Sequence, residues 1–262
     1  MRSTNIKYIP AVDQLRGFAA LLIVFYHGYH VISYHLLYGE PYKSDKWPDA
    51  TNPLHAFLIE GHTAVAMFMV LSGFIFTIGS FGKHVSYKQF LKNRFLRTYP
   101  LFLFLLMVGM IAAPQNISLN GVLKTVFFMS NANGAFHSGS FTAMFWTVAV
   151  EWHFYLAFPL LLALTNIKRA SFLICLIISF IILRLIIINY GENPTSPRDL
   201  SYWTIIGRMD QFALGMTSGL FYIKRFQKNL FFDMLTILFF ILICMYLYCL
   251  SLIHISEPTR PY

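Results

Sequence analysis

The sequence predicts an all-α protein, a polytopic transmembrane helical bundle with about seven spans. Of its 262 residues, 57% are hydrophobic and only 12% are charged, and the mean hydropathy is +0.59. Soluble domains carry about twice that share of charged residues. The charged residues here are gathered in short stretches, and the apolar runs between them are long enough to cross a bilayer. A soluble globular enzyme is therefore excluded.

Each predicted span is an apolar run close to the roughly 20 residues that a helix needs to cross a bilayer core. The third span is short. The apolar stretch 122–131 is too brief to cross, so we expect it to be a re-entrant or interfacial segment. The predicted spans are residues 12–36, 55–80, 98–113, 144–165, 171–190, 203–223 and 230–253.

The distribution of basic residues predicts the orientation. With a cytoplasmic amino terminus, twelve Lys and Arg residues lie on the cytoplasmic side, five on the opposite side and three within spans. A full crossing by 122–131 would invert every later loop and reverse this bias. Because the positive-inside rule explains the net charge of +9, we expect no nucleic-acid partner.

The chain is predicted to be one membrane domain over residues 1–253. Its loops are too short to form a soluble domain, and no internal repeat is present. All three cysteines lie inside apolar runs, so we expect neither a disulfide framework nor a bound metal. Residues 254–262 end the apolar pattern abruptly, and we expect them to be a non-native tail on a truncated chain.

Ionisable residues within spans are costly and are candidates for a site. Arg16 and His27 are eleven residues apart, which on a helix is about 20° past three full turns with a rise of about 16 Å. They therefore share one helical face, and Asp13 is placed to pair with Arg16. Interfacial snorkelling of the arginine and simple packing of the histidine remain alternatives.

Glu151 is expected at about the same membrane depth as His27, about 12 Å below the outer boundary. A carboxylate beside an imidazole orients its tautomer and raises its basicity, as general-base catalysis requires. Arg184 has no partner in the sequence pattern and is assigned no role. We interpret Glu60 and His62 as pore-lining or interfacial residues.

Two further patterns concern ligands and packing. Arg94 and Arg97 lie three residues apart in a basic segment before a span, which suits phosphate oxygens. Lipid headgroups and membrane topology explain the same basic cluster without a phosphorylated ligand. Ser72 and Gly73 are small residues in an apolar span, where they allow close helix approach or room for a ligand chain.

Five strings in order resemble the membrane acyltransferase family 3, a group of integral-membrane O-acyltransferases. The resemblance extends from about residue 11 to residue 219 and through the seventh span. Members of this family usually have more spans than we count here, which is why we expect a truncated chain. The strings are DQLRGFAALLIVFYHG, GHTAVAMFMVLSGF, RFLRTYP, FWTVAVEWHFYLAFP and RMDQFALGM.

The resemblance implies transfer of an acyl group, usually acetyl, from acyl-CoA to a hydroxyl of a cell-envelope saccharide at the bacterial inner membrane. His27 would act as a base or carry the acyl group, and these routes stay open. The resemblance implies three sets of site residues. The catalytic residues would be His27, Arg16 and Glu151, and CoA would bind to Arg94 and Arg97. The substrate would bind to Arg208, Asp210, Ser72 and Tyr155.

Two other functions remain possible from the residues. In a proton-coupled secondary transporter, Arg16, His27 and Glu151 would form a proton relay and substrate site, but such a protein has no need of the arginine pair at 94 and 97. In an inactive fragment or noncatalytic subunit, His27 would have no chemical role.

Overall fold

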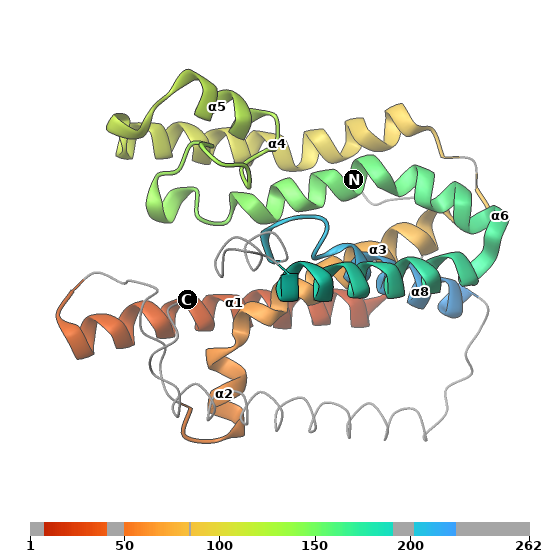
Figure 1. The fold of residues 1–262 in the computed structure, drawn as a ribbon, viewed down its shortest axis with the longest axis horizontal. Helices are drawn as coiled ribbons and strands as arrows, with labels where there is room; N and C mark the ends of the chain where they lie inside the picture. The colour runs from red at the N-terminus through yellow and green to blue at the C-terminus, as the bar shows by residue number, and fades with distance from the viewer. Residues whose placement is uncertain (1–7, 41–49, 84, 191–201, 224–262) are drawn as a thin grey trace. The chain divides into compact units, whose positions relative to one another are not determined.

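The computed structural model describes residues 8–40, 50–83, 85–190 and 202–223, and every regular element in these ranges is helical (Figure 1). The predicted span 230–253 and the tail 254–262 lie outside the described residues. The structure divides into an amino-terminal unit, residues 8–68, and a central unit, residues 69–223. The elements are α1 (Pro10–Tyr38), α2 (Pro53–Ile59), η1 (Gly61–Thr63), α3 (Ala64–Ser80), α4 (Tyr87–Ala112), η2 (Pro114–Asn116), α5 (Leu119–Val126), η3 (Gly139–Phe141), α6 (Phe145–Tyr190) and α8 (Met209–Ile223).

Within the described residues, four helical segments are long and apolar enough to cross a membrane. A fifth apolar segment, residues 171–187, is shorter. The predicted all-α membrane bundle is therefore confirmed, and the chain is a multi-pass membrane protein. The four long segments are Pro10–Tyr38, Gly61–Ser80, Tyr87–Ala112 and Phe145–Asn166.

Helix α1 agrees closely with the first predicted span. It begins at Pro10, where the missing proline N–H costs no intrahelical hydrogen bond, and it carries Asp13 in its first turn. It ends at Gly39, which adopts the left-handed conformation at φ 67° and donates its N–H to the carbonyl of His35 at 2.9 Å. These signals at both ends explain why the span could be predicted well.

The second predicted span, 55–80, is not one helix, and that prediction was wrong. Asn52 caps a separate helix, α2, by accepting a hydrogen bond from the His55 N–H at 2.9 Å, and the turn around Gly61 divides it from α3. A Cβ at Gly61 would lie 2.7 Å from the Tyr26 Cβ. The chain therefore approaches α1 too closely here for any residue larger than glycine.

Helix α4 begins eleven residues before the third predicted span. The Ser86 side chain caps it by accepting a hydrogen bond from Gln89, and the helix continues through Pro100 to Ala112. The basic segment is thus part of this helix. The next predicted feature, the interfacial stretch 122–131, contains the end of α5, which has eight residues and is about 12 Å long, too short to cross.

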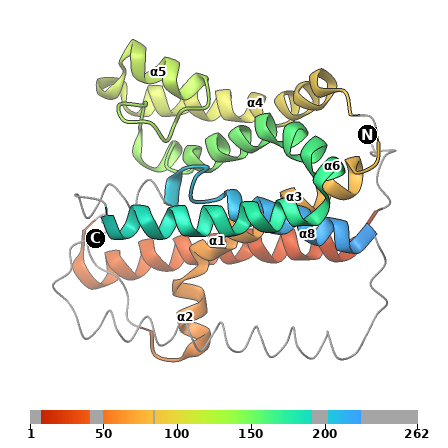
Figure 2. The same ribbon diagram turned by 45° about the vertical axis from the view of Figure 1, so that its right-hand side comes forward.

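Helix α6 has 46 residues and contains both the fourth and the fifth predicted spans. Its ribbon turns back on itself, and the two views in Figures 1 and 2 show this reversal from different directions. The predicted spans 144–165 and 171–190 correspond to the two arms on either side of the reversal. The predicted loop between them is helical in the structure.

Helix α8 begins at Met209 instead of residue 203, so the sixth predicted span is shorter than expected. It packs closely on α3 through glycines. A methyl group at Gly73 would clash with the carbonyl oxygen of Phe212, and one at Gly215 would clash with the carbonyl oxygen of Val70. Gly215 and Gly219 are four residues apart, the spacing of small residues that brings two membrane helices together.

Candidate functional site

A polar cluster in the central unit joins α3, α4 and α6. The Ser72 hydroxyl on α3 donates a hydrogen bond to Glu151 Oε1 on α6 at 3.1 Å. Arg94 on α4 interacts electrostatically with Glu151 and with Tyr155, which lies one turn beyond Glu151 on the same face of α6. Helix packing thus brings together four residues that the sequence marked separately. We call Ser72, Arg94, Glu151 and Tyr155 the polar cluster.

Arg94 is the cation of the polar cluster, and its guanidinium is packed among aromatic rings. Its Cζ lies 5.0 Å from the ring centroid of Phe76 and 6.0 Å from that of Phe90. Its Nε is buried and has no hydrogen-bond partner among the described residues. The Arg94 guanidinium therefore has hydrogen-bonding capacity that the protein itself does not use.

Arg97 was predicted to share a face with Arg94, but the two arginines have different surroundings. Arg97 is exposed, whereas Arg94 is half-buried. The Trp152 Nε1 donates to the hydroxyl of Thr98 at 3.1 Å, which fastens α6 to α4 beside the arginines. Arg94 is therefore the arginine packed into the polar cluster, whereas the exposed Arg97 reaches it through an electrostatic interaction with Tyr155.

Tyr155 is 3% exposed and lies in an aromatic shell. Its ring centroid is 5.4 Å from that of Phe76 and 5.5 Å from that of Trp152. The preceding residue, Phe154, stacks on Phe212 of α8, and their ring centroids are 3.8 Å apart. The shell holds the polar cluster between apolar rings, where electrostatic interactions are stronger than in water.

Arg16 and His27 lie on one continuous helix, α1, in the amino-terminal unit. The predicted pairing of Arg16 with Asp13 is present, with Nη1 3.8 Å from Oδ1. His27 is half-buried, and its ring lies edge-on to Tyr26 with a centroid distance of 4.8 Å. The predicted pairing of His27 with Glu151 stays a prediction, because these residues belong to different units.

The amino-terminal unit also gathers imidazoles that the sequence reasoning left without a common role. The ring of Tyr26 lies 4.4 Å from that of His30 and 5.7 Å from that of His62, and His62 Nδ1 is 3.5 Å from the Glu60 carboxylate. The signal available in the sequence was the number of His and Tyr residues between 26 and 62. Nothing in their spacing indicated that they meet around one tyrosine.

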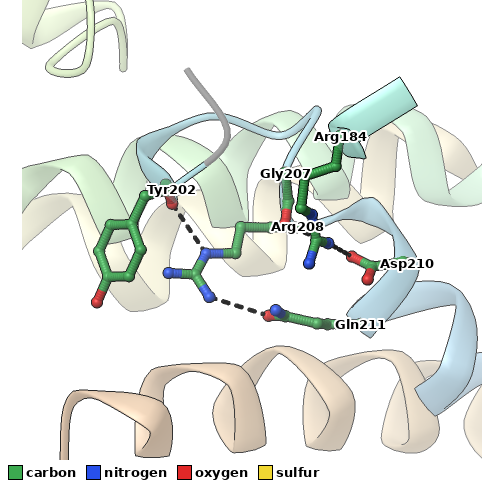
Figure 3. Close-up of polar contacts among 6 residues, drawn as sticks. All are labelled: Arg184, Tyr202, Gly207, Arg208, Asp210 and Gln211. Carbon is green, nitrogen blue, oxygen red and sulfur yellow. Dashed lines mark hydrogen bonds and ion pairs between the residues drawn. The ribbon is translucent and has the colours of Figure 1, made fainter. Parts of the chain in front are cut away.

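A second charged cluster surrounds the start of α8 (Figure 3). Arg184, on the second arm of α6, forms an ion pair with Asp210 at 2.5 Å and donates to the carbonyl of Gly207 at 2.8 Å. Arg208 donates from Nε to the carbonyl of Tyr202 at 2.9 Å. Sequence reasoning gave Arg184 no partner, and the structure gives it Asp210.

No group of three or more His, Cys, Asp or Glu side chains among the described residues is arranged to hold a metal ion. The central unit offers guanidinium groups for anionic oxygens and a carboxylate held by a hydroxyl, and the amino-terminal unit offers imidazoles. Such groups suit reactions that move protons and bind phosphates or carboxylates.

Comparisons with known proteins indicate the family of the chain. A family model described as an acyltransferase domain matches residues 9–262. A protein of Acidianus two-tailed virus whose name describes an acetyltransferase is 26% identical over 71% of this chain and 51% of its own length. A peptidoglycan O-acetyltransferase of Listeria monocytogenes is 28% identical over 81% of this chain and 33% of its own length.

A Bacillus subtilis protein, also named as a peptidoglycan O-acetyltransferase, is 24% identical over 85% of this chain and 35% of its own length. The chain thus spans about a third to a half of the length of these curated relatives. No solved structure matches it.

Proposed function

The chain belongs to the acyltransferase family whose model matches residues 9–262, and from this we propose that it is the membrane domain of an O-acyltransferase. It would transfer an acetyl group from acyl-CoA to a hydroxyl of a cell-envelope saccharide such as peptidoglycan. We place it in the bacterial cytoplasmic membrane with its amino terminus in the cytoplasm, on the basis of the basic residues.

The observation that carries this proposal is the half-buried Arg94 guanidinium, whose Nε lacks a hydrogen-bond partner among the described residues. Arg94 and the exposed Arg97 would bind the phosphates of CoA, since guanidinium groups match phosphate oxygens in geometry and charge. A transporter that moves only a small substrate has no need of this pair.

His27 would perform the chemistry by one of two routes. As a base, its imidazole takes the proton of the acceptor hydroxyl while the hydroxyl oxygen attacks the thioester carbon and CoA leaves as thiolate. As an acyl carrier, an imidazole nitrogen attacks the thioester carbon first, and the hydroxyl then displaces the imidazole. In both routes a new ester C–O bond replaces the C–S bond of the donor.

Glu151 would support this chemistry as the carboxylate partner of the imidazole, and Arg16 would help to hold the donor at the cytoplasmic end of α1. Ser72 and Tyr155 would line the passage for the acyl chain or acceptor beside Glu151. Arg208 would lie on the acceptor side. Asp210 is already paired with Arg184, so we assign it to holding α8 in place and not to contact with the substrate.

The test uses the full chain in lipid nanodiscs and radiolabelled acetyl-CoA. We expect the double variant Arg94→Ala with Arg97→Ala to bind acetyl-CoA at least about 10-fold more weakly, because two charge-assisted contacts are lost. The matched control is Lys88→Ala with Lys92→Ala, which removes the same charge from exposed positions on the same helix.

Equal loss of binding in both double variants would mean that the basic segment acts only through its net charge, and would contradict the proposed phosphate site. His27→Ala should retain acetyl-CoA binding and lose transfer. Transfer that survives in His27→Ala would exclude both routes through the imidazole, whereas a wild-type chain that binds acetyl-CoA but transfers nothing would favour a noncatalytic subunit.

A further inference from the structure

The charges at the start of α8 do not balance. Three charged side chains meet there, Arg184, Arg208 and Asp210, and the single carboxylate is taken by Arg184 at 2.5 Å (Figure 3). Arg208 has no ion-pair partner among the described residues. Asp210 also interacts electrostatically with Arg208, so one carboxylate is shared by two guanidinium groups and the three side chains carry a net charge of +1.

Arg208 is also deeply buried, with 7% of its surface exposed. Its Nε donates to the carbonyl oxygen of Tyr202 at 2.9 Å and its Nη1 to Gln211 Oε1 at 3.4 Å, both neutral acceptors. Its Nη2 is buried and has no hydrogen-bond partner among the described residues. In Figure 3 the dashed lines from Arg208 run to Tyr202 and Gln211, and the remaining terminal nitrogen of its guanidinium has none.

A buried cation that has no ion pair of its own and an unused N–H donor is unfavourable unless something supplies the missing partner. Arginine stays charged in proteins, so deprotonation does not relieve the cost. An anionic oxygen at Nη2 would satisfy the hydrogen bond and the charge together. This requirement identifies the chemical class of the ligand, a carboxylate or a phosphate oxygen.

Aromatic rings flank the same guanidinium. The Arg208 Cζ lies 4.2 Å from the ring centroid of Tyr202 and 5.6 Å from that of Trp146. Aromatic faces pack well against the apolar faces of sugar rings, and the exposed Trp203 follows Tyr202 in the sequence. The surroundings therefore favour an anionic group carried by a saccharide over a small inorganic ion.

Helix α6 carries residues of both clusters, Trp146 beside Arg208 and Glu151 in the polar cluster. Trp146 precedes Glu151 by five residues, which is a rise of about 7.5 Å along the helix. Trp146 and Glu151 are also about 140° apart around the helix axis, so the two clusters lie near the same end of α6 but on different faces of it.

We propose that Arg208 is the binding site for an anionic oxygen of the acceptor saccharide, and that it makes the enzyme prefer a carboxylate-bearing sugar to a neutral one. This inference rests on the proposed function, because it names the acceptor class of the same reaction. Asp210 and Arg184 hold the segment in place, and Tyr202 and Trp146 flank the sugar.

The experiment compares two acceptors of similar size in nanodiscs of phosphatidylcholine. One is a disaccharide containing N-acetylmuramic acid, which has a free carboxylate, and the other is chitobiose, which has none. We expect the wild-type chain to have at least about 10-fold higher kcat/KM for the carboxylate sugar. In Arg208→Gln this ratio should fall towards one, while Arg208→Lys should keep part of it.

The matched control is Lys88→Gln, which removes one positive charge from an exposed position and should keep the wild-type ratio. A wild-type ratio near one would overturn the inference without any variant, so poor folding of Arg208→Gln does not leave it undecided. If the ratio of the two kcat/KM values changes only when phosphatidylglycerol is added to the nanodiscs, the anion bound at Arg208 is a lipid headgroup. That result would also overturn the inference.

Equilibrium binding of the two labelled disaccharides separates this inference from the proposed function. If the wild-type chain transfers no acetyl group but binds the carboxylate sugar through Arg208, the acyltransferase proposal fails and the anion site stands. If transfer occurs and both sugars bind equally, the anion site fails alone.

Discussion

Three arginines of the central unit, two of them half-buried and one buried, differ in how their charge is compensated. Arg184 has a full ion pair with Asp210, whereas Arg94 has a carboxylate in electrostatic range and aromatic rings near its guanidinium. Arg208 donates only to neutral acceptors among the described residues, and it shares the electrostatic influence of Asp210 with Arg184. Because an uncompensated ion is costly in a bilayer protein, these differences separate a structural arginine from two that are placed to meet anionic ligands.

At the same scale, Ser72 is expected to orient the carboxylate of Glu151. Ser72→Ala removes the hydroxyl that donates to Glu151 Oε1 at 3.1 Å. A hydrogen bond to a charged group contributes about 1.5–3 kcal/mol, so we expect kcat for acetyl transfer to fall roughly 10- to 100-fold. The measurement is steady-state transfer at saturating acetyl-CoA.

The control for this prediction is Ser218→Ala on α8, where the hydroxyl donates only to the carbonyl of Leu214 in its own helix. We expect little change there. An unaltered kcat in Ser72→Ala would show that Glu151 is positioned without this hydrogen bond and would remove Ser72 from the site.

At the scale of elements, the contact between α3 and α8 depends on the absence of side chains. Gly73 and Gly215 each face a backbone carbonyl of the other helix, and a Cβ at Gly219 would lie 2.9 Å from the Cβ of Thr77. Backbones can approach so closely only where glycine is present. This contact places Ser72, the neighbour of Gly73, at the surface where it meets α6.

We therefore expect Gly215→Ala to destabilise the protein by about 1–3 kcal/mol, because the new methyl group would overlap the carbonyl of Val70. Gly17→Ala on α1 is the matched control, since a Cβ at Gly17 meets no atom within 4 Å and alanine is the better helix former. Thermal unfolding in detergent should show a lower Tm for the first variant only. A lower Tm for both, or for neither, would contradict this account of the helix contact.

For the whole molecule, the apolar surface is consistent with a lipid environment. Large apolar side chains are exposed on three long helices, among them Leu36 at 78%, Ile111 at 81% and Leu160 at 64%. In water such a surface would promote aggregation, whereas in hydrocarbon it is already solvated. The exposed apolar side chains therefore support the assignment of these helices as membrane spans.

The predicted orientation can be tested by cysteine labelling in intact bacterial cells. In a background without the three natural cysteines, Lys92→Cys should be protected from a membrane-impermeant thiol reagent and Lys124→Cys should react. The reason is that the basic residues of 83–97 are expected inside and Lys124 outside. Labelling of Lys92→Cys alone would show that the orientation is the reverse of the predicted one. The same reactivity at both positions would place residues 92 and 124 on one side of the membrane.

The sequence by itself determined that this is a helical membrane protein, where most of its long helices lie, and that Arg16 and His27 share α1. Hydropathy and helical period are properties of neighbouring residues, so they can be summed along the chain without knowing the fold. The caps at Pro10 and Gly39 are equally local. The five strings that indicated the family depend only on residue order.

Only the tertiary structure decided which charged and polar side chains meet. Ser72 and Glu151 are 79 residues apart in the sequence, and neither residue carries a local signal of the other. The pairing of Arg184 with Asp210 and the break at Gly61 have the same origin. Each depends on how one helix is rotated and how closely it approaches another, and that is decided by the packing of all the side chains between them.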